Sequence, residues 1–260
     1  MKNKIKAVFF DVDGTLLAHP EGIVPESTKR ALKKLRDQGI KVIVATGRHT
    51  QELQELPVKI LDFDGYVTLN GQLCLDAEKR VIYDAPISPA DTRTMVSIFE
   101  QKQIPTIVVE KDRLYINYVD DLVRRRQREI SSPVPEVSAY RGSNVYQFAM
   151  YVGKEEAEQI SRQLKSCTVT SWTSDAYDVI SMEGGKRKGI QRLIANYGIS
   201  RDEIMAFGDG ENDIDMLQYA QIGVALGDAN EKVKACADYV TDRVMDDGIE
   251  KALLYYNMIG

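Results

Sequence analysis

Short, largely apolar segments that alternate with amphipathic segments constrain the fold of this chain most strongly. The apolar segments are residues 6–10, 40–46, 65–71, 204–209, 222–226 and 238–241. Stretches with helical spacing of apolar residues, such as 25–39 and 189–198, lie between them. A strand, helix, strand order requires a parallel sheet with crossover helices, and strands this apolar are covered on both faces. We therefore predict an α/β fold with a central parallel sheet.

The middle of the chain, residues 83–183, has a different texture and predicts a second, smaller α/β domain inserted into the first. Residues 88–102 have the pattern of a helix, and residues 105–110 and 113–119 flank a charged turn, as in an antiparallel hairpin. Further strands rich in β-branched and aromatic residues are expected at 144–152, 167–173 and 177–183. We expect a discontinuous core domain, 1–82 with 184–260, and an inserted domain, 83–183.

The composition of the chain argues against some classes of binding partner. The chain has 260 residues and a formal net charge of -5, which argues against the basic surface that nucleic-acid binding needs. Its three cysteines are scattered without CxxC spacing, as expected in a reducing compartment. The apolar run near the N-terminus is too short for a signal peptide, and no run is long enough to span a membrane. We predict a cytoplasmic protein with neither nucleic-acid nor membrane partners.

Polar side chains stand where the predicted strands end. The first strand runs into two aspartates in VFFDVDGTLL, residues 8–17. These aspartates are Asp11 and Asp13. Polar residues also follow two other predicted strands: Thr46, Gly47 and Arg48 after one, and Asp209, Asn212 and Asp213 after the other. In open parallel sheets, ligands bind beyond the carboxyl ends of the strands. Six of these residues are therefore expected to converge on one crevice, although they are spread over two hundred positions: Asp11, Asp13, Thr46, Asp209, Asn212 and Asp213.

The chemistry of this set predicts a cation beside a phosphoryl group. Carboxylates at Asp11, Asp209 and Asp213 would repel one another, and a hard divalent cation such as Mg²⁺ relieves that repulsion. No histidine or cysteine is placed to favour zinc. The facing groups are donors: a hydroxyl at Thr46, backbone N–H groups near glycines, an amide at Asn212 and a lysine from GGKRKG, residues 184–189. Donors around one cation suit a phosphoryl group.

Four ordered motifs carry a resemblance to a known family. DVDGTLL, TGR, a lysine followed by glycine, and GDGEND resemble the motifs of the haloacid dehalogenase (HAD) superfamily of phosphatases. An α/β insertion between the second and third motifs is similar to the Cof-type subgroup, whose cap is of class IIB. The resemblance implies a Rossmann-like core with a central parallel sheet, an inserted α/β cap and Mg²⁺-dependent hydrolysis of a small phosphorylated metabolite.

Catalytic and metal-binding roles follow from the same resemblance. It implies that Asp11 is the nucleophile that forms an aspartyl-phosphate, and that Asp13 is the acid and base. Asp13 must be protonated for the first step, so we expect its anionic neighbours to raise its pKa. The resemblance places the metal at Asp11, at the backbone carbonyl of Asp13, at Asp209 and, as an outer carboxylate, at Asp213.

The remaining implied contacts bind the phosphoryl group or the substrate. They are Val12, Thr46, Gly47, Lys188 and Asn212. Lys186 competes with Lys188 for the lysine of the third motif, and Lys188 is preferred because Gly189 and a helix follow it directly. His49 is expected to be an ordinary surface histidine, with contact to the substrate as the alternative. The basic run at 124–128 is expected to be a solvated helix face paired with Asp120 and Asp121, with a surface that attracts polyanionic substrates as the alternative.

Two motifs also resemble those of proteins with other functions. GDGEND approaches the dinucleotide fingerprint, but an aspartate replaces its third glycine, and Asp209 would repel a pyrophosphate. DVDGT differs from a calcium loop in the position of its glycine. A phosphomutase of the same superfamily and a non-catalytic phosphate-binding regulatory module remain as alternatives. The expected substrate is a sugar phosphate or a phosphorylated cofactor.

Overall fold

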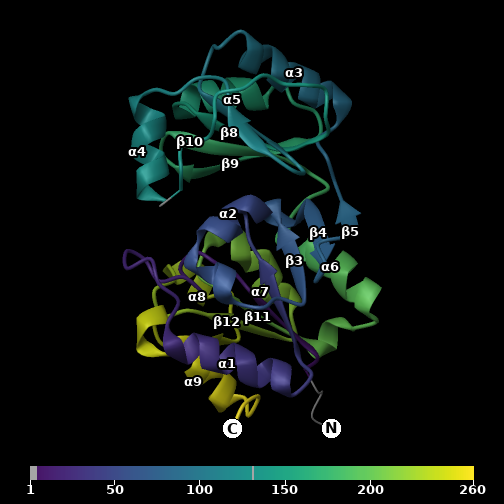
Figure 1. Cartoon of the computed structure of the whole chain (residues 1–260), viewed down its shortest axis with the longest axis vertical. Helices are drawn as coiled ribbons and strands as arrows, with labels where there is room; N and C mark the ends of the chain where they lie inside the picture. Colours follow the sequence, from purple (N-terminus) through teal and green to yellow (C-terminus); the bar gives the residue numbers. More distant parts are fainter. Residues whose placement is uncertain (1–4, 131) are drawn as a thin grey trace. The chain divides into compact units, whose positions relative to one another are not determined.

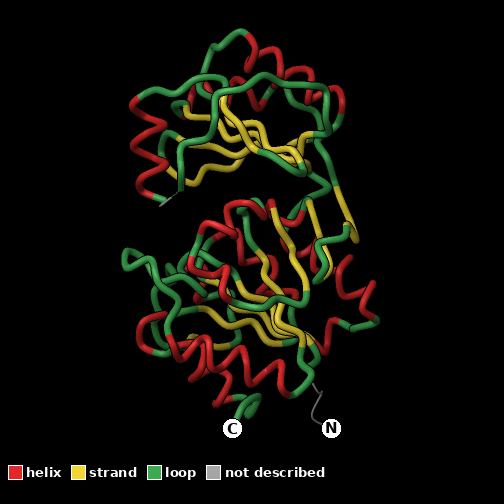
Figure 2. The backbone as a smooth tube through the Cα atoms, in the orientation of Figure 1, coloured by secondary structure: helices red, strands yellow, loops and turns green. Residues whose placement is uncertain are grey.

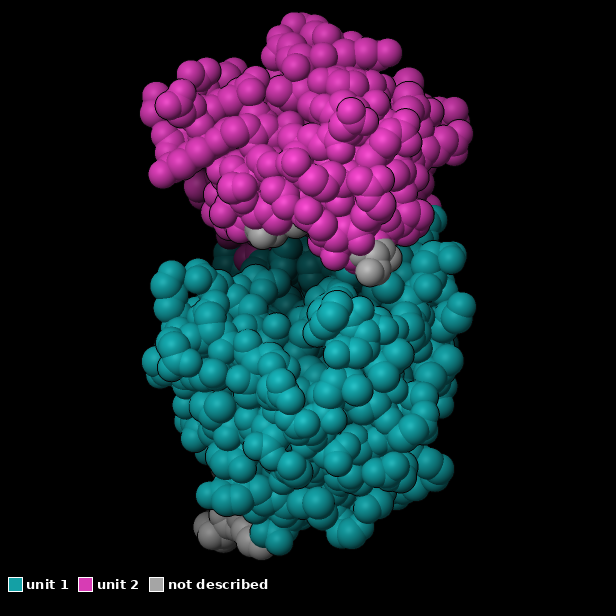
Figure 3. All heavy atoms as spheres, turned by 90° about the vertical axis from the view of Figure 1, so that its left-hand side faces the viewer, with its two compact units in different colours: residues 1–84, 185–260 teal, residues 85–184 magenta. Residues whose placement is uncertain are grey.

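The computed structural model describes residues 5–130 and 132–260 and divides the chain into two compact units. One unit, here called the core, comprises residues 1–84 and 185–260, and the other, the cap, comprises residues 85–184 (Figures 1 and 3). These boundaries lie one or two residues beyond those predicted from the sequence. None of the helices within the described ranges is long and apolar enough to cross a membrane.

The core is built on an eight-stranded sheet in the order β13-β12-β11-β1-β2-β3-β4-β5. The parallel strands are β1 (Ala7–Phe10), β2 (Lys41–Ala45), β3 (Gly65–Thr68), β11 (Ile204–Gly208), β12 (Ile222–Ala225) and β13 (Tyr239–Val240). The predicted parallel sheet is therefore confirmed. Two antiparallel strands, β4 (Leu73–Asp76) and β5 (Val81–Asp84), extend it after β3 and were not predicted. Short turns reverse the chain there, so no crossover helix marks them in the sequence.

Helices and short 3₁₀ turns connect the strands of the core. The helices are α1 (Glu26–Asp37), α2 (Thr50–Glu55), α6 (Lys186–Tyr197), α7 (Ile214–Tyr219), α8 (Glu231–Lys234) and α9 (Gly248–Tyr255). The 3₁₀ turns include η2 (Leu69–Gly71), after β3, and η4 (Glu211–Asp213), before α7. Helix α9 lies beyond residues 238–241, the last segment for which the sequence pattern predicted an element, so this helix was not predicted.

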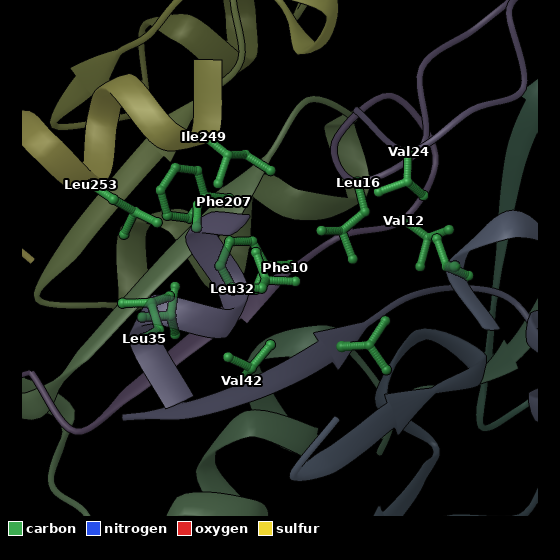
Figure 4. Packing of buried hydrophobic residues seen from close by; sticks show 14 of the residues in the cluster. Phe10, Val12, Leu16, Val24, Leu32, Leu35, Val42, Phe207, Ile249 and Leu253 are labelled. Carbon is green, nitrogen blue, oxygen red and sulfur yellow. The ribbon is translucent and has the colours of Figure 1, made fainter. Parts of the chain in front are cut away.

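Apolar residues cover both faces of the core sheet because side chains alternate along each strand. On one face, Phe10 of β1 stacks on Phe207 of β11 with ring centroids 5.0 Å apart. Figure 4 shows these rings among side chains of α1 and α9, such as Leu32 and Ile249. Ala7 and Phe9 belong to the opposite cluster, with Ile190 and other residues of α6. Strand β1 is thus fully buried as far as Asp11.

The cap has its own five-stranded antiparallel sheet in the order β7-β6-β8-β10-β9. Its strands are β6 (Thr106–Glu110), β7 (Leu114–Ile116), β8 (Val145–Tyr151), β9 (Cys167–Thr173) and β10 (Ala176–Ser181). The pairing of β6 with β7 is the antiparallel hairpin expected from the sequence. Helices α3 (Pro89–Glu100) and α5 (Lys154–Ser161) lie on one face of this sheet, where Met95 and Ile160 enter the cap's hydrophobic cluster (Figures 1 and 2).

The basic run forms part of helix α4 (Asp121–Glu129), but its ion pairs differ from those expected. Arg125 and Arg126 pair with Asp175, which precedes β10. Asp120 instead accepts a hydrogen bond from the backbone N–H of Val123 and caps the helix. The side chain of the residue before a helix faces the free N–H groups of the first turn. This position of Asp120 favours the hydrogen bond to Val123 over an ion pair.

Candidate active site

A buried lysine joins two carboxylates that come from distant parts of the core. Asp11 directly follows β1, and its backbone N–H donates to the carbonyl of Phe207 on β11 (3.0 Å). Lys186 is the first residue of α6, and its Nζ lies 2.6 Å from Oδ1 of Asp11 and 2.5 Å from Oδ1 of Asp213. The side chain of Lys186 is fully buried, so this charge is neutralised by protein groups alone.

The structure brings Lys186 to Asp11, so the prediction of Lys188 as the lysine of the third motif is wrong. Successive residues of a helix are about 100° apart, so side chains two positions apart point to nearly opposite sides. The glycine that favoured Lys188 has a different explanation. A Cβ on Gly189 would lie 2.7 Å from a methyl carbon of Val67, so this glycine lets α6 pack closely against β3.

Asp209 follows β11 and is held by the loop after β1. The hydroxyl of Thr15 donates to Oδ1 of Asp209 (2.8 Å). Gly14 has a φ of +78°, and a Cβ there would lie only 2.1 Å from Oδ2 of Asp209, so only glycine fits. Thr15 was missed in the sequence analysis, although it stands within the quoted DVDGTLL motif.

Three carboxylates meet at this point. Asp11, Asp209 and Asp213 each offer an oxygen that lies within 4.8 Å of the other two. Burial and the charge of Asp213 raise the pKa of Asp11 well above its usual value, against the opposing charge of Lys186. The same two causes raise the pKa of Asp209 to about 7. One lysine therefore leaves negative charge uncompensated, which is the condition that a divalent cation with oxygen ligands relieves.

The three carboxylates are not equally available to a cation. Oδ1 of Asp213 contacts Lys186, and its Oδ2 accepts the backbone N–H groups of Asp209 (3.0 Å) and Gly210 (2.9 Å). Asp11 and Asp209 each have one oxygen without a hydrogen-bond donor among residues 5–130 and 132–260. The residues present thus fit Mg²⁺, with Asp11 and Asp209 as ligands and Asp213 behind them.

Asp13 departs from the expectation of a raised pKa. Its oxygens accept a fork of hydrogen bonds from Arg48, with Nε at 2.6 Å and Nη2 at 2.7 Å, and Nε2 of His19 lies 3.1 Å away. Burial alone would raise the pKa of Asp13, but the contacts with His19 and Arg48 outweigh it and hold the pKa well below its usual range. No role for Arg48 or His19 was predicted from the sequence.

Apart from Lys188, the predicted phosphate-binding residues belong to the loops that carry this site. Thr46 is buried, and its hydroxyl accepts the backbone N–H of Arg48 (3.1 Å). The side chain of Val12 is buried in the core cluster, so only its backbone is available to a ligand. Asn212 is exposed on η4, and its Nδ2 donates to Oδ1 of Asn70 (3.3 Å). Asn70 was another residue that the sequence analysis left without a role.

His49 is not the surface histidine that was expected. It is 1% exposed and caps α2, where its Nδ1 accepts the backbone N–H of Gln51 (3.1 Å). Its own backbone N–H donates to the carboxylate of Glu52 (2.8 Å). This reciprocal capping explains a histidine directly after the TGR motif without a role in the chemistry.

Comparisons with known proteins identify the family of this chain. The sequence profile of the haloacid dehalogenase-like hydrolases matches residues 8–253. The solved structure of the HAD subclass IIB sugar phosphatase BT4131 is 36% identical, has a TM-score of 0.85, and the match covers 98% of this chain and 100% of that one. The pyridoxal phosphate phosphatase YbhA of Escherichia coli (strain K12) is 24% identical, with 98% of this chain and 99% of that protein covered.

A further relative is the 5-amino-6-(5-phospho-D-ribitylamino)uracil phosphatase YitU of Bacillus subtilis (strain 168). It is 26% identical over 272 residues, which cover 98% of this chain and 99% of that protein. The chain therefore belongs to the haloacid dehalogenase-like hydrolases, in the Cof-type subgroup with a class IIB cap. Within that family it is a phosphatase.

Proposed function

We propose that the chain hydrolyses a small phosphorylated metabolite with Mg²⁺, through an aspartyl-phosphate on Asp11. The observation that carries the proposal is the setting of Asp11: a buried carboxylate at the carboxyl end of β1, held by a buried lysine and crowded by two further carboxylates. A carboxylate nucleophile divides a difficult displacement into two easier steps. Bound Mg²⁺ would neutralise charge on the phosphoryl group.

In the first step, an oxygen of Asp11 attacks phosphorus while the bond from phosphorus to the leaving oxygen breaks. Asp13 donates a proton to that leaving oxygen. In the second step, water attacks phosphorus, Asp13 takes a proton from the water, and the bond from phosphorus to Asp11 breaks, which restores both carboxyl groups. The low pKa of Asp13 in its contact with Arg48 and His19 suits the second step directly. For the first step, Asp13 must take up a proton, and this requires a looser contact with those two side chains.

The other groups position the reactants. Lys186 holds Asp11 at 2.6 Å and is itself held by Asp213, so the orientation of the nucleophile is set before substrate arrives. Thr46 and the backbone of Gly47 bind the phosphoryl oxygens, with Asn212 beside them. The relatives act, as their names state, on a sugar phosphate, on pyridoxal phosphate and on a phosphorylated ribitylamino uracil. These support a sugar phosphate or a phosphorylated cofactor as the substrate of this chain.

Phosphate release from an aryl phosphate tests the proposal, with and without Mg²⁺. Wild-type protein should release phosphate only with Mg²⁺, and Asp11→Asn should abolish release because an amide cannot form the aspartyl-phosphate. Asp62→Asn is the matched control, since Asp62 is an exposed carboxylate of the same unit that pairs with Arg36. It should keep wild-type activity.

Two results would count against the proposal. Release by Asp11→Asn at the wild-type rate would remove Asp11 as the nucleophile. Transfer of the phosphoryl group to a second metabolite instead of water, detected by product analysis in ¹⁸O-labelled water, would favour the phosphomutase.

A further inference from the structure

The turn after β3 has a backbone that most residues avoid. Leu69, Asn70 and Gly71 have φ angles of 52°, 53° and 83°, so three successive residues lie in the left-handed region. Asparagine tolerates this region better than other residues with a side chain, and leucine tolerates it poorly. Such conformations persist only where their surroundings hold them in place.

Hydrogen bonds from two other motifs hold this turn. The backbone N–H groups of Leu69 and Asn70 donate to the carbonyls of Arg48 (3.3 Å) and Thr46 (3.0 Å). The carbonyl of Asn70 accepts the N–H of Gly185 (2.7 Å), directly before Lys186. The turn therefore joins the TGR loop to the start of α6, and it fixes where the side chain of Asn70 lies.

That side chain lies against the proposed phosphate-binding loop. A Cβ on Gly47 would lie 3.1 Å from Oδ1 and 3.2 Å from Nδ2 of Asn70. Oδ1 accepts the hydrogen bond from Asn212 (3.3 Å). Nδ2 donates to no acceptor in the part of the chain that the structure describes, although Asn70 is half-buried. Two N–H donors thus remain available beside Gly47.

We propose that Asn70 is a phosphate-binding residue, which holds the amide of Asn212 through Oδ1 and donates from Nδ2 to a phosphoryl oxygen. The inference rests on the proposed function, because it takes Thr46 and Gly47 as the phosphate-binding loop. Nδ2 is a neutral donor, so it adds to the cradle without competing with Lys186 for the carboxylates. The left-handed turn orients this donor toward the loop at Gly47. Asparagine suits this position because it tolerates a left-handed backbone and its side-chain amide can donate hydrogen bonds.

Direct binding of inorganic phosphate to the Mg²⁺-loaded protein, measured by calorimetry, tests the inference without turnover. Asn70→Gly keeps the left-handed turn and removes the amide, so the Kd for phosphate should rise about tenfold. Asn70→Asp keeps an acceptor for Asn212 but replaces the donor with a negative charge, so its Kd should rise further. Asn257→Gly, at another left-handed asparagine of the core (φ 54°), is the matched control and should leave the Kd unchanged.

Steady-state kinetics and thermal unfolding complete the test. The value of kcat/KM should fall in parallel with phosphate affinity, while Asn70→Gly unfolds at the wild-type temperature or above, because glycine relieves the backbone strain. A wild-type Kd in either Asn70 variant would overturn the inference. Wild-type protein that binds phosphate but does not hydrolyse substrate would overturn the proposed function instead, and the Kd values would still test Asn70.

Discussion

The core and the cap each bury a carboxylate, and they treat it in opposite ways. In the cap, Asp91 is 1% exposed and accepts the N–H groups of Lys165 (3.0 Å) and Ser166 (2.8 Å) and the hydroxyl of Ser166 (2.6 Å). Burial would raise its pKa, but these donors outweigh burial and lower the pKa to about 2. In the core, burial and like charges raise the pKa of Asp11 and of Asp209.

The difference separates a structural carboxylate from the carboxylates of the proposed active site. Asp91 fastens α3 to the segment before β9, and the donors that surround it satisfy its charge completely. The carboxylates at the end of β1 and β11 have too few donors for their charge, and this arrangement costs stability unless a cation binds. A shortage of hydrogen-bond partners, more than burial itself, therefore marks the proposed active site.

The largest expected effect comes from removing the buried ammonium group of Lys186. Lys186→Met leaves Asp11 and Asp213 buried without their partner, so it should lower the free energy of unfolding by about 3 kcal/mol or more. It should also reduce phosphate release at least a hundredfold, roughly the cost of losing one preorganised electrostatic contact. Urea unfolding and the aryl phosphate assay measure these effects. Lys188→Met is the matched control, with an expected change in stability within about 0.5 kcal/mol; equal effects of the two variants would contradict the assignment of Lys186.

A smaller effect is expected when the satisfied carboxylate of the cap is removed. Asp91→Ala leaves the N–H groups of Lys165 and Ser166 without an acceptor, which should destabilise the protein by about 2 kcal/mol. Hydrogen exchange should show faster exchange in α3 and β9, with β1 of the core unchanged. Glu100→Ala, an exposed carboxylate on the same helix, should have no measurable effect. Loss of protection in β1 would show that Asp91 does not act within the cap alone.

The contribution of Asp91 to the free energy of unfolding should depend on pH in the acid range. The folded pKa of Asp91 is about 2, below its unfolded value near 3.8, so its contribution to stability is present above pH 4. That contribution, about 2 kcal/mol, is lost as the pH falls from about 4 through about 2. Unfolding by urea across this range should show a shallower loss of stability in Asp91→Asn than in the wild type. Identical slopes would contradict the prediction.

The smallest expected effect is an increase in the free energy of unfolding, whereas the variants above lower it. Without metal, Asp209→Asn removes one of three crowded carboxylate charges, so the free energy of unfolding in EDTA should rise by about 1 kcal/mol. Excess Mg²⁺ should stabilise the wild type but not this variant, because one of the proposed metal ligands is gone. Thermal unfolding measures both, with the exposed Asp202→Asn as control. A lower unfolding temperature of Asp209→Asn in EDTA would mean that the cluster is not crowded.

Periodicity and strand ends allowed much of the core to be predicted from the sequence. In the core, short apolar runs that alternate with amphipathic helices indicate buried parallel strands, and the residue after each run lies at the carboxyl edge of the sheet. Asp11, Thr46 and Asp209 could therefore be placed near one another from local patterns alone. The strands β4 and β5 could not be predicted in the same way, since short turns leave no helical pattern between them.

Only the tertiary structure decided which side chains meet. The choice of Lys186 over Lys188 depends on how α6 is rotated against β3, and Lys186 lies 175 positions from Asp11 in the chain. The contacts of Asp13 with Arg48 and His19, and the left-handed turn that aims Asn70, depend likewise on how separate loops approach. Sequence patterns report the path of the backbone within each segment, whereas pairing between segments is set by packing, which no single segment encodes.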